Sequence, residues 1–247
     1  MSPKYDVLNQ LELETDPAEE KVRGAVDQVI LDKISPKGPG DPLTEEMLHL
    51  AQTSFLSSTG RVPRLVVFCG VEEENGSSSV CAGAGRAIAL LGAKTVCLVD
   101  ANIRTLRLSR VFGVDSSIPY PGKPLSPREQ CLLLQHNLFL AGTEMLFDSR
   151  GALLSAPDLK QRLKQLQDCF DYVLIDAPAS SVCGDAIALG QIADAAILVI
   201  EANKTRRLTA RRAKETLEAS GVRLLGTVLR NQSFPIPKSL LKRLSGS

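Results

Sequence analysis

Short apolar runs alternate along the chain with longer segments of amphipathic character. The runs occupy residues 64–69, 93–102, 170–180, 194–203 and 222–231. Each is rich in Val, Leu and Ile and stays apolar almost to its end, which is typical of a strand buried on both faces of a parallel sheet. The segments with helical spacing occupy residues 80–93, 156–169, 185–193 and 204–221. This alternation predicts an α/β fold, with a doubly wound, mostly parallel sheet flanked by helices in a single domain.

The N-terminal part has a different character. Residues 1–35 show no sustained period, and SPKGPGDP (35–42) concentrates proline and glycine. We therefore predict an N-terminal extension and linker over residues 1–40, partly disordered, and an ordered domain over 41–247. Within that domain, residues 41–58 carry Leu43, Met47 and Leu50 at helical spacing, which predicts a helix before the first strand.

Charge and cysteine content narrow the setting. The 247 residues carry 29 Lys and Arg against 28 Asp and Glu, so no overall field attracts the chain to nucleic acid or lipid. The six cysteines include no CxxC pair, which indicates a reduced compartment and argues against a disulfide framework or a metal site. No apolar stretch reaches the roughly 20 residues that span a bilayer, so we expect a cytoplasmic protein without a transmembrane segment of its own.

Polar residues that carry chemistry follow the apolar runs. In open α/β sheets, ligands bind at the carboxyl ends of the strands. The loop GVEEENGSSSV (70–80) follows the first run and precedes a helix, while Asp100 and Asp176 stand at the ends of two other runs. Strand, loop and helix in this order are typical of a phosphate-binding loop. There, backbone N–H groups and a lysine hold phosphates, and a Ser or Thr with strand-end aspartates holds Mg²⁺.

Several of these segments together resemble one family. The segments are LVDANIR (98–104), FDYVLIDAPAS (170–180), GDAIALGQIADAAILVIEA (184–202) and LLGTVLRNQSFPIPKSLLKRL (224–244). In this order and spacing, from about residue 43 to 244, they resemble the bacterial tyrosine autokinases of capsule and exopolysaccharide export, which are related to the septum-site and plasmid-partition ATPases. The resemblance implies a fold like that of the P-loop NTPases.

The phosphate loop departs from the family's pattern. Where the family has Pro-Gly-x-Gly-Lys-Ser/Thr, residues 73–78 read EENGSS. Gly76 and Ser78 match the pattern, but Ser77 stands at the lysine position. Losing the lysine removes charge-assisted hydrogen bonds of about 1.5–3 kcal/mol each. One of the three glutamates, Glu72 to Glu74, at about 4 Å from a phosphate charge adds roughly 4 kcal/mol of repulsion at an effective dielectric near 20. Tight binding of ATP or ADP with Mg²⁺ is therefore not expected.

The acidic motifs match the family's pattern more closely than the phosphate loop does. Asp100 and Asp176 match the family's two principal acids and Arg104 is present, whereas Asn102 replaces a second aspartate. The resemblance thus implies three overlapping groups of site residues. The catalytic residues would be Asp100 and Asp176, the nucleotide contacts Gly76, Ser77, Ser78 and Arg104, and the Mg²⁺ ligands Ser78, Asp100 and Asp176.

Two further features of active family members are missing. The E-x-x-R-x-x-R pattern used in ring assembly corresponds here to Glu46, His49 and Gln52, and the C-terminal tail has no tyrosine cluster. The leading hypothesis is therefore a degenerate member of the family, a pseudoenzyme at the inner face of the membrane. It would act as a regulator or scaffold that contacts a membrane polysaccharide co-polymerase, an export protein or an active paralogue, and homo-oligomers remain open.

Two alternatives remain. The first is an active ATPase or tyrosine kinase with a rewired loop, which recruits Arg86, Lys94 or Arg104 in place of the lysine. The second is a partition-like ATPase relative that binds DNA through a basic helix at 204–214, although the balanced net charge disfavours nucleic acid. On that helix, Leu208 and Ala213 are expected to face the core. Its six basic residues are Lys204, Arg206, Arg207, Arg211, Arg212 and Lys214.

Overall fold

The structure is a computed structural model. It describes residues 42–56, 62–92, 94–103, 105–114, 126–135, 137–179 and 184–230. The predicted extension over 1–40, the candidate Arg104 and the C-terminal segment 231–247 lie outside the described residues.

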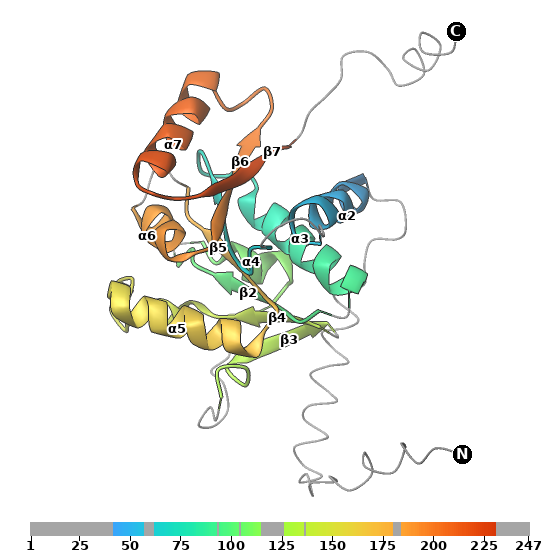
Figure 1. The fold of residues 1–247 in the computed structure, drawn as a ribbon, viewed down its shortest axis with the longest axis vertical. Helices are drawn as coiled ribbons and strands as arrows, with labels where there is room; N and C mark the ends of the chain where they lie inside the picture. The colour runs from blue at the N-terminus through green and yellow to red at the C-terminus, as the bar shows by residue number, and fades with distance from the viewer. Residues whose placement is uncertain are drawn as a thin grey trace, which may run out of the picture. The chain divides into compact units, whose positions relative to one another are not determined.

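A seven-stranded sheet forms the centre of the described part (Figure 1). Its strands lie in the order β3-β4-β2-β5-β1-β6-β7, and only β3 runs antiparallel to its neighbour. β1, β5 and β2 are buried along their whole length, as their apolar sequences predict. The strands are β1 (Leu65–Gly70), β2 (Val96–Asp100), β3 (Cys131–Gln135), β4 (Leu138–Ala141), β5 (Tyr172–Ala177), β6 (Ala195–Glu201) and β7 (Leu224–Arg230).

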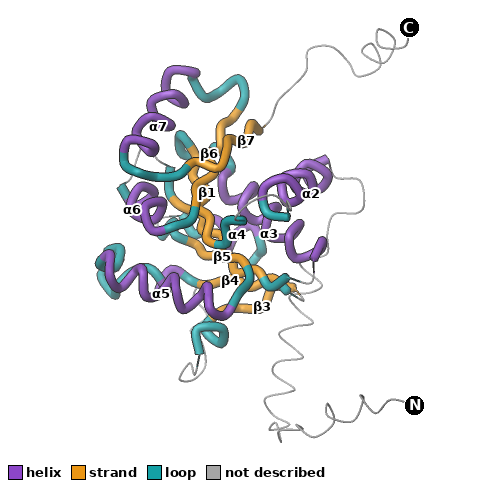
Figure 2. Tube along the Cα trace, in the orientation of Figure 1, coloured by secondary structure: helices purple, strands orange, loops and turns teal. Residues whose placement is uncertain are grey.

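Helices cover both faces of the sheet. α2, α3 and α4 lie on one side, and α5, α6 and α7 lie on the other (Figures 1 and 2). This arrangement confirms the predicted doubly wound, mostly parallel α/β fold. The helices are α2 (Pro42–Ser54), α3 (Ser77–Gly92), α4 (Arg107–Val111), α5 (Ala156–Cys169), α6 (Asp185–Ile192) and α7 (Arg207–Ala219), with a 3₁₀ turn, η1 (Thr143–Met145).

Three elements, β3, β4 and α4, are not predicted from the sequence. β3 and β4 form an antiparallel pair at one edge of the sheet, joined by only two residues, and neither glycine nor proline marks the turn. β3 lies at the edge and exposes Leu133, so its pattern is neither fully apolar nor cleanly alternating. α4 has five residues, too few for a periodic pattern.

The predicted orientation of α7 is wrong at one position. Leu208 is 59 % exposed, whereas Leu217 is fully buried and Ala210 and Ala213 pack against the core. Positions 210, 213 and 217 follow helical spacing and define the face toward the sheet. Leu208 lies on a different side of the helix from that face, because five residues to Ala213 do not complete a whole number of turns.

The small residues of α3 allow two close approaches. A Cβ built on Gly83 would lie 2.6 Å from Cγ of Met47 in α2, and one built on Gly85 would lie 2.7 Å from Cδ2 of Leu98 in β2. Such distances are too short for any side chain to fit without displacing its neighbour. The segment AGAGR therefore fixes how closely α3 packs on the sheet and how closely α2 packs on α3.

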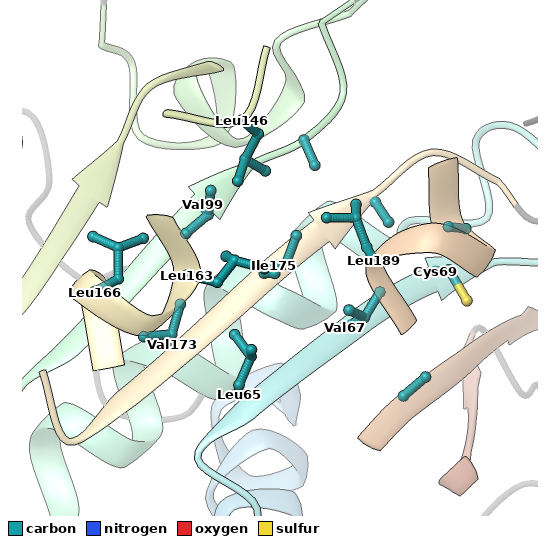
Figure 3. Close-up of a cluster of buried hydrophobic side chains, with 14 of the residues drawn as sticks. Leu65, Val67, Cys69, Val99, Leu146, Leu163, Leu166, Val173, Ile175 and Leu189 are labelled. Carbon is teal, nitrogen blue, oxygen red and sulfur yellow. The ribbon is translucent and has the colours of Figure 1, made fainter. Parts of the chain in front are cut away.

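The main apolar core lies between the sheet and the helices α5 and α6 (Figure 3). In Figure 3, Leu163 and Leu166 of α5 lie over Val173 and Ile175 of β5. The cysteines that the structure describes form no disulfide bond with one another, and Cys69, Cys81, Cys97 and Cys131 are buried. Within the described ranges, no cluster of His, Cys, Asp and Glu is arranged to hold a metal ion, and no helix has the length and apolarity to cross a bilayer.

Candidate functional site

The carboxyl ends of three neighbouring strands bring the predicted acids and the loop together. Asp100 ends β2 and is the register partner of Asp176 in β5, while β1, which pairs with the other side of β5, leads into the loop. The hydroxyl of Ser77, at the start of α3, donates a hydrogen bond of 3.2 Å to Oδ1 of Asp176. Gly76, Ser77, Asp100 and Asp176 therefore lie around one point at this edge of the sheet.

The loop has two residues in left-handed backbone conformation. The φ angles are 66° at Glu74 and 75° at Gly76, the positions where the resembling family has its two glycines. Between them, Asn75 is buried, and its side-chain amide donates to Oγ1 of Thr205 at 3.2 Å. A glutamate in this conformation is uncommon and costs about 1–2 kcal/mol. The loop thus has positive φ at both glycine positions although one glycine and the lysine are absent.

Among the described acids of the site, Asp176 has the pKa that departs most from its ordinary value. Burial raises its pKa to about 7; the Asp100 charge adds to the rise, and the hydroxyls of Ser78 and Ser77 oppose it. Its Oδ2 atom is buried and has no hydrogen-bond partner. An unpaired carboxylate oxygen in a buried place is costly, so Asp176 holds a proton more readily than an ordinary aspartate.

Both carboxylate oxygens of Asp100 accept hydrogen bonds from backbone N–H groups. Its Oδ1 accepts the N–H of Asn102 at 3.1 Å, and its Oδ2 accepts the N–H groups of Leu108 at 3.2 Å and Ser109 at 3.5 Å. Burial raises the pKa of Asp100, and these N–H donors oppose the rise. Because Leu108 and Ser109 belong to the first turn of α4, the carboxylate anchors that helix to the end of β2.

A small cleft lined largely by acidic residues opens beside the loop. Its volume is about 40 Å³, enough for about three waters at 10–15 Å³ each. Arg107 lies 3.9 Å from the carboxylate of Glu74 across the cleft. The polar and charged residues that line the cleft are Glu72, Glu73, Glu74, Ser77, Asn102, Thr105, Arg107 and Asp185.

Arg230 reaches the loop from the last residue of β7. A Cβ built on Gly76 would lie 1.3 Å from Nη1 and 2.5 Å from Cζ of Arg230, so the guanidinium rests directly on the Gly76 backbone. Nη1 also donates to the carbonyl of Asn75 at 3.5 Å. The space over the loop at Gly76 is thus filled by a side chain of the same protein.

These residues do not fit the phosphates of a nucleotide. The lysine position holds Ser77, which is bonded to Asp176, carboxylates line the cleft, and a guanidinium covers Gly76. Mg²⁺ in nucleotide enzymes is held by one or two carboxylates together with the substrate phosphates. Asp176 offers one free oxygen for such an ion, but Asp100 has both oxygens engaged.

The cations named as substitutes for the lysine lie elsewhere or outside the described residues. Lys94 precedes β2 and pairs with Asp171 at 3.5 Å, at the amino ends of the strands, which is the opposite edge of the sheet. Arg86 lies nine residues into α3 from Ser77, about 14 Å along the axis. Its guanidinium stacks on the ring of Phe112 at 4.6 Å.

Sequence reasoning missed the two arginines that the structure places at the loop. Arg230 ends a predicted strand, so the rule that ligands meet the carboxyl ends of strands would have included it. Arg107 had no comparable signal, since it lies in a helix too short to predict.

The structure also places the residues that correspond to the ring-assembly pattern, and one of the three tyrosines. Glu46, His49 and Gln52 are all exposed on α2. Tyr172 is buried and donates its hydroxyl to the carbonyl of Phe55 at 2.9 Å, as expected for a core residue. The other tyrosines, Tyr5 and Tyr120, lie outside the described residues.

The sheet order, the strand-loop-helix unit at β1 and the two strand-end acids define a protein with a fold like that of the P-loop NTPases. No family model matches the sequence. The sequence is 27 % identical over 195 residues to the tyrosine-protein kinase CpsD of Streptococcus agalactiae serotype Ia, covering 77 % of this chain and 83 % of that protein. It is 26 % identical over 197 residues to the tyrosine-protein kinase YwqD of Bacillus subtilis, covering 78 % and 83 %.

Solved structures agree with this likeness. The kinase domain of Escherichia coli tyrosine kinase ETK superimposes with a TM-score of 0.62 at 18 % identity, covering 84 % of this chain and 83 % of that one. MinD of Aquifex aeolicus superimposes with a TM-score of 0.53 at 21 % identity, covering 74 % and 73 %. The structures confirm the fold, and the sequence matches confirm the resemblance to bacterial tyrosine kinases.

Proposed function

We propose that this protein is a cytoplasmic relative of the bacterial tyrosine kinases that does not bind nucleotide tightly. It acts as a regulator or scaffold in capsule or exopolysaccharide production, where it contacts a membrane polysaccharide co-polymerase or an active paralogue. The observation that carries the proposal is the hydrogen bond between Ser77 and Asp176 at the place where the lysine of a working loop would act.

Charge at the site supports the proposal. A nucleotide with about three to four negative charges would meet the carboxylates of Glu72, Glu73 and Glu74. Arg107, the basic residue that lines the same cleft, is paired with Glu74. These three carboxylates therefore repel the phosphates that the fold would otherwise bind.

Isothermal titration with Mg-ATP and Mg-ADP tests the proposal directly. We expect no heat of binding at micromolar nucleotide, and no release of phosphate over hours. Micromolar affinity together with turnover that Asp176→Asn abolishes would instead support the rewired enzyme, for which the free Oδ2 of Asp176 is the favouring observation.

The partner is tested separately. A regulator of a membrane complex should sediment with membranes that contain the co-polymerase and should stay in solution with membranes that lack it. Recovery in solution from both membranes would contradict the scaffold role even if no nucleotide binds.

The DNA-binding alternative receives little support from α7. Arg211 pairs with Glu215 at 2.7 Å, and Lys214 approaches Glu218 at 3.6 Å, so two of its basic side chains are balanced by acids one turn on. A gel shift at about 150 mM salt should show no retardation of duplex DNA.

A further inference from the structure

The contact between Arg230 and Gly76 joins two parts of the chain that lie far apart in sequence. β6 separates β7 from β1, so the Arg230 side chain must cross the end of β6 to reach the loop. It rests there on a residue with no side chain and with a φ of 75°. Any residue larger than glycine at position 76 would displace the guanidinium from this place.

The guanidinium also has a hydrogen-bond partner in the loop. Nη1 points to the carbonyl of Asn75, whose side chain is itself held by Thr205 after β6. β7, the turn after β6 and the loop after β1 are thus connected through Asn75. The loop is held from the β7 side by groups of the chain itself.

Arg230 consequently restricts the approach to the loop at Gly76. A phosphate group binds a loop of this kind by coming close to glycine backbone, which is why glycine is needed there. Beside Gly76, the place that a side chain would take is filled by Nη1 and Cζ of Arg230, so this approach to the glycine is closed.

We propose that Arg230 is a built-in occupant of the phosphate loop, which keeps the loop closed to phosphate ligands and holds its shape without one. This inference rests on the proposed function, because it explains how a loop that binds no nucleotide keeps its conformation. It adds a further barrier that is independent of the missing lysine and of the glutamates.

Restoring the loop separates this barrier from the others. A triple variant, Glu73→Pro with Glu74→Gly and Ser77→Lys, brings back the pattern of the resembling family and removes two of the three glutamates. Binding of fluorescently labelled ADP with Mg²⁺ is then compared with and without Arg230→Ala. We expect Arg230→Ala to tighten binding about tenfold, because the ligand no longer displaces a hydrogen-bonded guanidinium.

Arg223→Ala in the same triple variant is the matched control. Arg223 is exposed and directly precedes the other end of β7, so its loss removes the same charge without touching the loop. It should change the affinity by less than about twofold. Equal or weaker binding after Arg230→Ala would overturn the inference, and so would an absence of binding by both restored proteins.

A second measurement needs no nucleotide. Hydrogen exchange in the otherwise unchanged protein should become faster at the amides of residues 74–80 after Arg230→Ala, and should remain unchanged there after Arg223→Ala. Unchanged exchange at the loop in a folded Arg230→Ala variant would contradict the inference. Nucleotide binding by the unchanged protein would refute the proposed function, whereas these comparisons decide the role of Arg230.

Discussion

Asp100 and Asp176 are direct neighbours on adjacent parallel strands, and both carboxyl groups are buried. The two differ in their partners: Asp100 accepts three backbone N–H groups, whereas Asp176 accepts hydroxyl groups of the loop and its Oδ2 has no hydrogen-bond partner. Asp100 is therefore held as part of the architecture, and Asp176 is the group whose protonation the fold controls.

Asp176 should make the protein less stable as pH rises. Its pKa rises from 3.8 to about 7 on folding, because burial disfavours the charged form. Between these values the folded state keeps a proton that the unfolded state has lost, so stability falls from about pH 4 to pH 7. Asp176→Asn should remove this dependence and stabilise the protein at pH 8 by up to about 4 kcal/mol, at 1.36 kcal/mol per pKa unit.

Urea unfolding at pH 5 and pH 8 measures this effect. Asp168→Asn is the control, since Asp168 is an exposed carboxylate that pairs with Lys164 on α5. An equal loss of stability between the two pH values in the Asp176→Asn variant and in the unchanged protein would show that another group is responsible.

Glu74→Gly should stabilise the protein. Glu74 has a φ of 66°, a conformation that costs a non-glycine residue about 1–2 kcal/mol, and glycine gives back part of this through its flexible unfolded state. Its ion pair with Arg107 is long, at 3.9 Å, and the Glu74 side chain is exposed, so the pair adds little. We expect a gain of up to about 1 kcal/mol in the free energy of unfolding. Glu73→Gly, at a position without positive φ, should give no gain, and a gain there of the same size would argue against the strain.

Gly85→Val should destabilise the fold through overpacking. A Cβ at position 85 would lie 2.7 Å from Leu98 and 3.3 Å from Leu138, so the branched side chain would push α3 away from the sheet. We expect a cost of about 1–3 kcal/mol in thermal or urea unfolding. Ala89→Val, on the same helix at a partly exposed position, controls for helix propensity. Similar costs for both variants would mean that the close packing at Gly85 is not the cause.

Arg64→Ala should weaken the junction between α5 and β5. The Arg64 guanidinium donates to the carbonyls of Gln167, Phe170 and Asp171 at 2.8–2.9 Å, and so it satisfies acceptors at the end of α5. Because several bonds to a charged donor are lost from an exposed site, we expect a cost of about 1–2 kcal/mol. Urea unfolding measures it, with Arg223→Ala as the control, and Arg64→Lys should recover only part of the loss because a lysine lacks the planar fork.

Most strands and helices of the fold could be predicted from the sequence, but fewer of the residues at the site. The buried strands were predictable because each is an apolar run, and in Val96–Asp100 and Tyr172–Ala177 an aspartate stands at or next to the last position. Positions at strand ends likewise predicted that Asp100 and Asp176 would meet. The edge hairpin from Cys131 to Ala141 was not predictable, since exposure on one side removes the continuous apolar signal.

The face to which Arg230 points could not be derived from alternation. Ala196 pairs with Leu224 but Ile197 pairs with Gly226, so one extra residue in β7 interrupts the ladder. Simple alternation would send Leu224 and Arg230 to the same side, and the interruption changes the side from Gly226 onward. Leu224 accordingly packs against the core while Arg230 reaches the loop.

The glycines of α3 separate two kinds of information that sequence comparison usually mixes. Gly83 and Gly85 are required by contact with Met47 and Leu98, whether or not a ligand lies at the start of the helix. The glycines of such a helix therefore indicate how a nucleotide-binding fold is packed, but they do not indicate whether the protein binds a nucleotide. A chain can keep every packing requirement of such a helix, match kinases over most of its length, and still have exchanged the groups that touch phosphate.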